Sequence, residues 1–182
     1  MNELAETRDE TTIPRLMGIL DEEDVVYRRS AVQVLGIIGA DAVPSLVDSL
    51  LNSPNATIQA SCAKALTAIA VNYPDLTFPE LGIQGLKKAL GDPNPVVYIS
   101  AAMALGQIGA PALDILVETI ETTDNIALAV AVTGALGTIG GPKAAEVLSA
   151  TAANSDADPY IRESAESALS RLQQVTQWNS GG

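Results

Sequence analysis

The stretch LGQIG, Leu105–Gly109, decides the fold, because close copies of it recur along the chain. LGIIG begins at Leu35 and LGTIG at Leu136, and two weaker copies, LTAIA and LSRL, begin at Leu66 and Leu169. The five leucines are separated by 31, 39, 31 and 33 residues. Self-similarity at a period in the thirties is typical of helical repeat proteins, so the spacing predicts about five repeats.

Each repeat is predicted to contain two antiparallel helices, the second of which ends at the repeated motif. The positions eight, four and one before the leucine are apolar in the copy at Leu105, where they are Val97, Ala101 and Ala104, and Tyr27 takes the first of these places in the first copy. An α-helix turns by about 100° per residue, so these positions share the core-facing side of the helix. The pattern predicts an all-α fold, a right-handed α-solenoid of about five helix pairs. First helices of the pairs that follow are predicted at Ala42–Leu51, Pro111–Ile120 and Pro142–Thr151.

The repeats run through nearly the whole chain, and residues 1–175 are therefore predicted to form a single domain. The first residues, Met1–Asp9, look like the tail of a helix, so the first repeat is expected to be incomplete. Residues 176–182 are predicted to be a disordered tail, although Trp178 within it is expected to pack on the last repeat.

The eight extra residues between the second and third copies fall in VNYPDLTFPE, Val71–Glu80, where two prolines rule out a continuous helix. Two interpretations are open. The segment is either a longer connection whose Tyr73, Leu76 and Phe78 seal the core, or a recognition loop that interrupts the stack.

Composition narrows the choice of partner. A net charge of −12 argues against nucleic acid, whose phosphates require a basic stripe, and against an anionic membrane surface. No run of about 18 apolar residues and no signal peptide is found, so we expect a cytosolic protein without membrane insertion. A soluble protein partner or a small ligand remains.

Residues suited to catalysis or metal binding are scarce, because the chain has one cysteine and no histidine. A zinc site and a histidine-based catalytic relay are thereby excluded. Cys62 lies four residues before Leu66, where the other repeats have alanine or valine, so it is predicted to be a buried small hydrophobe rather than a reactive thiol or an iron–sulfur ligand. We expect no catalytic residue, no metal and no cofactor.

The acidic run DEED, Asp21–Asp24, has two possible uses, a helix cap or a metal site. Acidic turns at matching places in later repeats favour the cap, since carboxylates accept hydrogen bonds from the free N–H groups of a helix start.

The stretches VVYRRSAVQVLGIIG, Val25–Gly39, and PVVYISAAMALGQIG, Pro95–Gly109, resemble the HEAT-like repeats of the cyanobacterial phycobilisome-lyase family. The resemblance covers about residues 10–172. It implies one of three kinds of protein: an E/F-type bilin lyase subunit that attaches tetrapyrroles to phycobiliprotein cysteines as a heterodimer, a protein that binds phycobiliproteins during phycobilisome breakdown, or a HEAT-repeat protein that associates with an A-type iron–sulfur carrier. The run RDETTIPRLM, Arg8–Met17, and the insert YPDLTFPE look most like the last kind. Members that also isomerise the bilin use an adjacent His-Cys pair, which this chain lacks.

A candidate binding surface is predicted opposite the core. Positions six and two before the leucine lie about 120° and 160° around the helix from it. They are apolar in the third and fourth repeats, and apolar residues on an exposed face are typical of a contact surface. The alternative is that neighbouring helices cover them. We predict the floor of a binding groove with a polar end, and its partner-binding residues are Ile99, Met103, Val130, Gly134, Tyr98, Arg28, Arg29 and Lys64.

Arg28 and Arg29 have two possible uses as well. They can pair with the propionates of a tetrapyrrole, or they can neutralise the acidic turn beside them, which is the favoured interpretation.

The predicted function is a non-catalytic scaffold or chaperone-like adaptor whose partner is a phycobiliprotein, a second HEAT-repeat chain or an iron–sulfur carrier. The alternative is an enzyme, a subunit of a heterodimeric bilin lyase.

Overall fold

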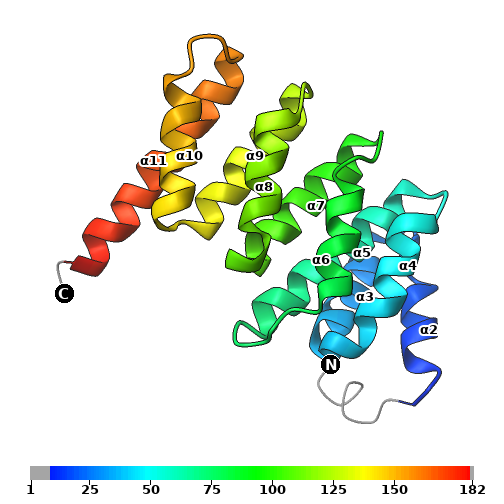
Figure 1. Ribbon diagram of the computed structural model, residues 1–182. Helices are drawn as coiled ribbons and strands as arrows, with labels where there is room; N and C mark the ends of the chain where they lie inside the picture. Colours follow the sequence, from blue (N-terminus) through cyan, green and yellow to red (C-terminus); the bar gives the residue numbers. More distant parts are fainter. Residues whose placement is uncertain (1–8, 181–182) are drawn as a thin grey trace. The chain divides into compact units, whose positions relative to one another are not determined.

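The computed structural model describes residues 9–180, with side chains to residue 174, and its secondary structure over these residues is entirely helical (Figure 1). Five consecutive helix pairs follow one another, as the five leucines predict. Contacts divide the chain into two compact units, Met1–Ala104 and Leu105–Gly182, and the boundary falls within one helix. The two units are described separately, and the single domain predicted for residues 1–175 remains a prediction.

Unit 1 is built as two layers of helices. The second helices of its repeats, α3 and α5, pack side by side in one layer, and the first helices α4 and α6 pack in the other. We call these B helices and A helices. The elements are α2 (Thr12–Met17), α3 (Val25–Ile38), the 3₁₀ turn η1 (Gly39–Ala42), α4 (Val43–Asn52), α5 (Ala56–Asn72), α6 (Glu80–Ala89) and the first part of α7 (Pro95–Ile108).

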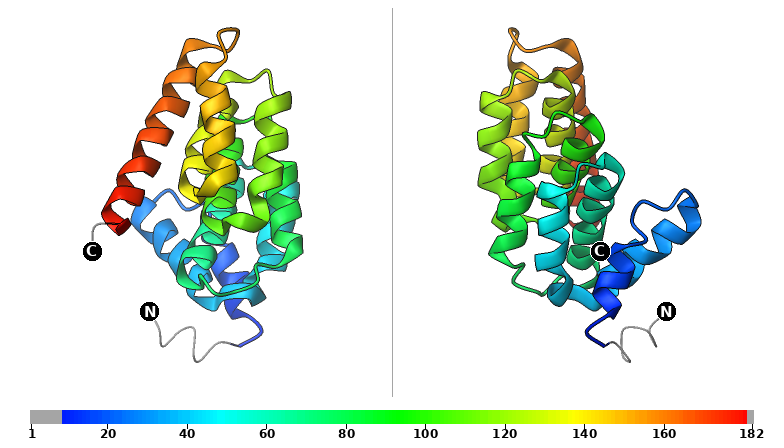
Figure 2. Two further views of the ribbon diagram at one scale, coloured as in Figure 1. Left: turned by 60° about the vertical axis from the view of Figure 1, so that its left-hand side comes forward. Right: turned by 90° about the vertical axis from the view of Figure 1, so that its right-hand side faces the viewer.

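Unit 2 repeats the same arrangement. The B helices α9 and α11 pack against each other, and the A helices α8 and α10 pack against them. Figure 2 shows α10 and α11 lying side by side in antiparallel orientation. After the end of α7, the elements are η2 (Ala110–Ala112), α8 (Leu113–Thr122), α9 (Ile126–Ile139), α10 (Gly141–Ala153) and α11 (Pro159–Ser180).

The helix starts and stops follow the predicted chemistry. The Asp24 carboxylate accepts hydrogen bonds from the main-chain N–H groups of Val26, at 2.8 Å, and Tyr27, at 3.2 Å, so the acidic turn is a helix cap as predicted. Asn55 caps α5 in the same way. At the other end of α3, Gly39 has φ of +79°, a conformation that suits glycine and turns the chain back toward the next A helix.

The first glycine of each motif has a role that the sequence pattern did not reveal. Gly36 lies inside α3, and a Cβ built on it would be 2.5 Å from the Cβ of Ala68 on α5. Gly106 meets Ala135 of α9 in the same manner, at 3.0 Å from its Cα. These glycines allow adjacent B helices to approach closely, while the second glycine of the motif ends the helix.

The core is made of small aliphatic residues, as the spacing predicts. The leucines that begin the motifs are fully buried in the first four repeats, at Leu35, Leu66, Leu105 and Leu136. Tyr27 is the exception to the predicted core stripe, because 55% of it is exposed on the first B helix.

The insert between α5 and α6 combines features of both open interpretations. Phe78 is buried and lies against Gly82 at the start of α6, so it seals the core as predicted. The Tyr73 hydroxyl donates a hydrogen bond to the main-chain oxygen of Ile37, which fixes the loop to the end of α3. Leu76 and Tyr73 are both exposed, so their predicted place in the core is wrong. Leu76 ends the turn that begins at Tyr73, while Phe78 is the side chain of this loop that enters the interior.

The last helix is longer than predicted. α11 continues to Ser180, so the backbone of residues 176–180 is helical. The disorder predicted for residues 176–182 remains a prediction. Neither proline nor glycine occurs between Pro159 and Gly181 to stop the helix. The side chain of Trp178, the residues before Asp9 and the final two glycines lie outside the described residues.

Candidate partner-binding surfaces

The position two residues before the motif leucine faces outward, as predicted. Gln33, Lys64, Met103 and Ser167 occupy it in four repeats and are all exposed. Met103 is the large apolar member of this row, and 60% of it is accessible. It can therefore be covered by a partner without rearrangement of α7.

The position six residues before the leucine is more covered than predicted. Ile99 and Val130 are half-buried, and Ala60 is buried on α5. The side chain at this position points about 120° from the leucine, between the core side and the outward side of the helix. Neighbouring B helices in the same layer therefore cover part of it. Gly134, on the outward row of α9, is half-buried too.

Tyr98 was predicted at the edge of the binding surface, and the structure corrects this. Only 6% of it is exposed. It precedes Leu105 by seven residues, or about 20° around the helix, so its side chain lies on the core side. Tyr98 is a packing residue of unit 1.

The two arginines of α3 differ in their surroundings. Nη1 of Arg28 donates a hydrogen bond to the main-chain oxygen of Glu22. Arg28 therefore contacts the acidic turn, as the favoured interpretation expects, but it binds a carbonyl group rather than a carboxylate. Arg29 is exposed, as is Lys64 on α5. These two cations are the part of the predicted polar end that is available for contact.

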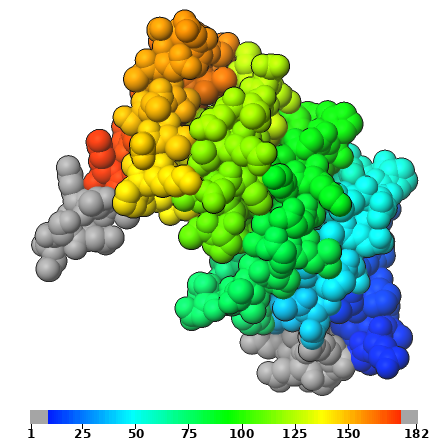
Figure 3. All heavy atoms as spheres, in the orientation of Figure 1, coloured from blue at the N-terminus to red at the C-terminus, as the bar shows by residue number. Residues whose placement is uncertain are grey.

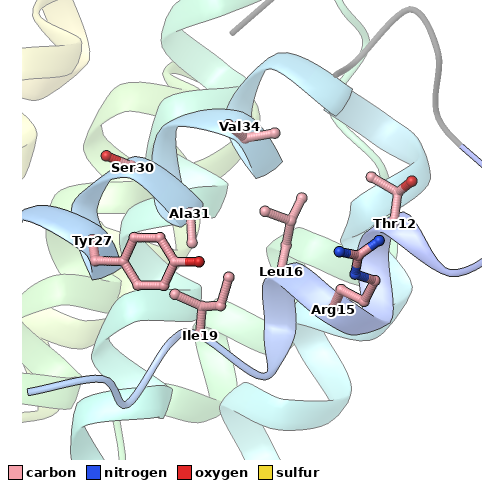
Figure 4. A pocket seen from close by; sticks show the side chains of 8 residues that line it. All are labelled: Thr12, Arg15, Leu16, Ile19, Tyr27, Ser30, Ala31 and Val34. Carbon is pink, nitrogen blue, oxygen red and sulfur yellow. The ribbon is translucent and has the colours of Figure 1, made fainter.

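A hollow of about 270 Å³ lies between α2 and α3, and the sequence pattern did not predict it. Figure 4 shows Tyr27 and Ile19 on one side of the opening, Arg15 and Thr12 on the other, and Leu16 between them. Most of its lining is apolar, and the polar groups are the guanidinium of Arg15 and the hydroxyl groups of Thr12, Tyr27 and Ser30. This hollow explains the exposure of Tyr27, whose ring forms its wall. The available signal was a tyrosine in a column that is otherwise aliphatic.

A second, wider hollow of about 700 Å³ lies in unit 2 and is lined by residues of the turns after α8 and α10 and of the adjoining helices. Four carboxylates line it, from Glu121, Asp124, Glu146 and Asp156, above an apolar floor. Across the residues for which side chains are described, no three acidic or thiol groups are placed to share a metal ion. The nearby Lys143 ammonium is 2.6 Å from Asp114, and this hydrogen bond raises the pKa of the lysine.

Cys62 is inaccessible, as predicted. It is fully buried in α5, and burial raises the pKa of its thiol to about 12. A thiol in this state is neither a nucleophile nor a ready metal ligand.

Comparison with known protein families assigns the chain to the helical repeat proteins. Residues 1–67 and 83–170 match the family of HEAT repeats, and the chain belongs to this family. The all-α repeat fold predicted from the motif is thereby confirmed, while the handedness of the solenoid remains a prediction.

Two similar proteins narrow the family further. The chain is 49% identical over 172 residues to phycocyanin operon protein Z of Pseudanabaena tenuis, covering 94% of this chain and 85% of the relative. It is 33% identical over 178 residues to the bilin biosynthesis protein CpeZ of a Synechococcus strain, covering 94% and 95%. The predicted resemblance to the phycobilisome-lyase HEAT proteins is confirmed.

A solved structure supports the fold. The complex of CpcE and CpcF of phycocyanin lyase from Nostoc matches with a TM-score of 0.58 at 20% identity, covering 93% of this chain and 68% of that one. At this identity the likeness concerns the fold alone.

The run Val25–Asn52 is long and apolar enough to cross a membrane by length and hydropathy. It consists of α3 and α4 separated by the reversal at Gly39, and 56% of its most apolar window is buried inside the fold. The same features are found in the core helices of soluble proteins.

Proposed function

We propose that the protein is a non-catalytic scaffold that binds a protein partner in bilin metabolism. The observation that supports this proposal most strongly is the outward row of the B helices, where Met103 exposes a large apolar side chain beside polar neighbours. Apolar residues of this kind on the ordered face of a repeat protein are typical of a contact surface. The lack of any histidine, together with the buried state of Cys62, supports a binding role rather than a chemical one.

The partner favoured by the relatives is a phycobiliprotein, since one of them is named for the phycocyanin operon and the other for bilin biosynthesis. A second HEAT-repeat chain and an iron–sulfur carrier are the other candidates, and neither relative's name mentions iron–sulfur chemistry. In unit 1 the contact residues are Arg29, Lys64, Ile99 and Met103, and in unit 2 they are Val130 and Gly134. The site of action is the cytosol.

A second candidate function is a subunit of a heterodimeric bilin lyase. Its support is the relative named as a bilin biosynthesis protein and the fold shared with the lyase pair. In this case the chain would contribute binding surface while another subunit held most of the chromophore.

The test is co-purification of a tagged full chain with phycobiliprotein subunits. Met103→Glu places a charge on the exposed apolar site, and we expect recovery of the subunit to fall about tenfold, with helicity and melting temperature unchanged. Ser149→Glu is the control, because it adds the same charge at an exposed position of an A helix. Equal recovery with both variants would refute a role for the B face.

A further inference from the structure

The insert between α5 and α6 is an unexplained feature, because apolar side chains are exposed on its loop and on the ends of the two helices that flank it. Eleven large hydrophobic residues are exposed in the described part of the chain, and four of them fall within eleven consecutive positions. These four are Val71, Tyr73, Leu76 and Leu81, which we call the insert patch. Figure 3 shows this blue-green segment projecting from unit 1.

The loop that carries Tyr73 and Leu76 is fixed by contacts with the rest of unit 1. Phe78 is buried below it, and the main-chain N–H of Leu76 donates to the oxygen of Tyr73 at 3.0 Å. The Tyr73 ring packs on Gly39, 3.0 Å from the Cβ position of that glycine, while its hydroxyl is bound to Ile37. A loop ordered in this way loses little conformational entropy when a partner covers it.

The negative charge around the insert patch indicates which kind of partner can bind there. Asp75 lies between Tyr73 and Leu76, and Glu80 precedes Leu81, and both carboxylates are exposed. The whole chain carries a net charge of −12, so a second copy of it would bring like charge to the patch. A partner with aliphatic side chains and interspersed lysine or arginine would instead find complementary charge.

We propose that the insert patch is a docking surface for a basic, aliphatic segment of a partner protein. Tyr73, Leu76 and Leu81 lie beyond the outward row of the B helices, on the loop and on α6, whereas Val71 lies on the outward side of α5, seven residues after Lys64. The proposal does not depend on the function proposed for the row that includes Met103. Binding through it would bury Leu76 and Val71 and pair Asp75 with a cationic side chain.

A designed peptide tests the proposal with the full chain. The probe is a fluorescent amphipathic helix of leucine and lysine, titrated at about 0.15 M salt and followed by anisotropy. Leu76→Ser and Asp75→Lys are each expected to weaken its binding about fivefold or more. A peptide in which glutamate replaces lysine should not bind.

Matched controls separate the patch from the general charge of the protein. Ile126→Ser removes an exposed aliphatic residue and Glu166→Lys reverses an exposed charge, both in unit 2, and each should leave affinity within about twofold. The proposal is overturned if the wild type fails to bind, or if Glu166→Lys weakens binding as much as Asp75→Lys does. It is also overturned if Leu76→Ser turns a dimer into a monomer without changing peptide affinity, because the occupant would then be a second copy.

Discussion

At the scale of single residues, Cys62 shows how the repeat pattern assigns a role without any structural knowledge. The matching positions in the other repeats are alanine at 31, 101 and 165 and valine at 132. With Cys62, these side chains are small enough to predict a tightly packed column. The structure buries the thiol completely and raises its pKa to about 12. Its chemistry is thereby suppressed.

We expect iodoacetamide to label native Cys62 at least about 100-fold more slowly than a free peptide thiol at neutral pH, because only an accessible thiolate reacts. The measurement is the rate of mass increase of the native protein, with the urea-unfolded chain as control. Labelling at the rate of the free thiol would show that the residue is not buried.

The raised pKa also predicts a dependence of stability on pH. The thiol is protonated in both states below its ordinary pKa of 9.0, so its contribution is unchanged there. As pH rises above 9.0 the unfolded chain releases the proton first, and folding stability is lost toward pH 12. Cys62→Ala should remove this loss, so between about pH 8 and about pH 10 the unfolding free energy of the variant should fall less than that of the wild type. Parallel curves would contradict the assignment.

Two glycines of the B helices provide a further contrast at this scale. A Cβ on Gly36 would be 2.5 Å from Ala68, whereas nothing lies within 4 Å of the same position on Gly134. Gly36→Ala should therefore lower the free energy of unfolding by about 1–3 kcal/mol through overpacking. Gly134→Ala should raise it by about 0.5–1 kcal/mol, because alanine favours the helix. Urea denaturation of both variants tests this, and stabilisation by Gly36→Ala would show that α3 and α5 are not in close contact.

At the scale of the elements, the sequence predicts the helix pairs, the caps and the phase of each B helix, because all three depend on local spacing. It does not predict how far each face is covered. Position six before the leucine is exposed in Arg29 and buried in Ala60, and the difference depends on the neighbouring helix. The burial of Tyr98 was within reach, since seven residues return a helix almost to the same side.

The hollow between α2 and α3 could not be predicted, because it is formed by residues of two helices whose distance the pattern does not specify. The insert was partly predictable for a similar reason. Its prolines indicate a break, while only the packing decides which of its three apolar side chains is buried.

The anchor of the insert gives a test at this scale. Phe78→Ala should lower the free energy of unfolding by about 3–5 kcal/mol, because it leaves a cavity against Gly82. Leu76→Ala is the comparison on the same loop and should cost less than about 1 kcal/mol, since the side chain is already exposed. Thermal denaturation of the two variants measures the difference. Equal losses would mean that Phe78 is not the anchor of the loop.

At the scale of the whole molecule, composition restricts the classes of partner. The chain's charge of −12 disfavours nucleic acid and favours partners with a basic surface, and two relatives are named for the phycocyanin operon and for bilin biosynthesis. Repeat number was predictable from the period of the motif, and the family was predictable from the resemblance of Val25–Gly39 and Pro95–Gly109 to its repeats. The partner was not, since an interface depends on a second surface that the sequence does not contain.

The central claim, binding without chemistry, is tested most directly by co-expressing this chain with a phycobiliprotein subunit and a bilin in a bacterial host, with and without an E/F-type HEAT-repeat chain. Covalent chromophore is detected by zinc-induced fluorescence on a denaturing gel. The scaffold account predicts no fluorescent band from this chain alone, and none when this chain is combined with a single E/F-type chain. A covalent band that appears only when this chain is present would contradict the account and identify a lyase subunit.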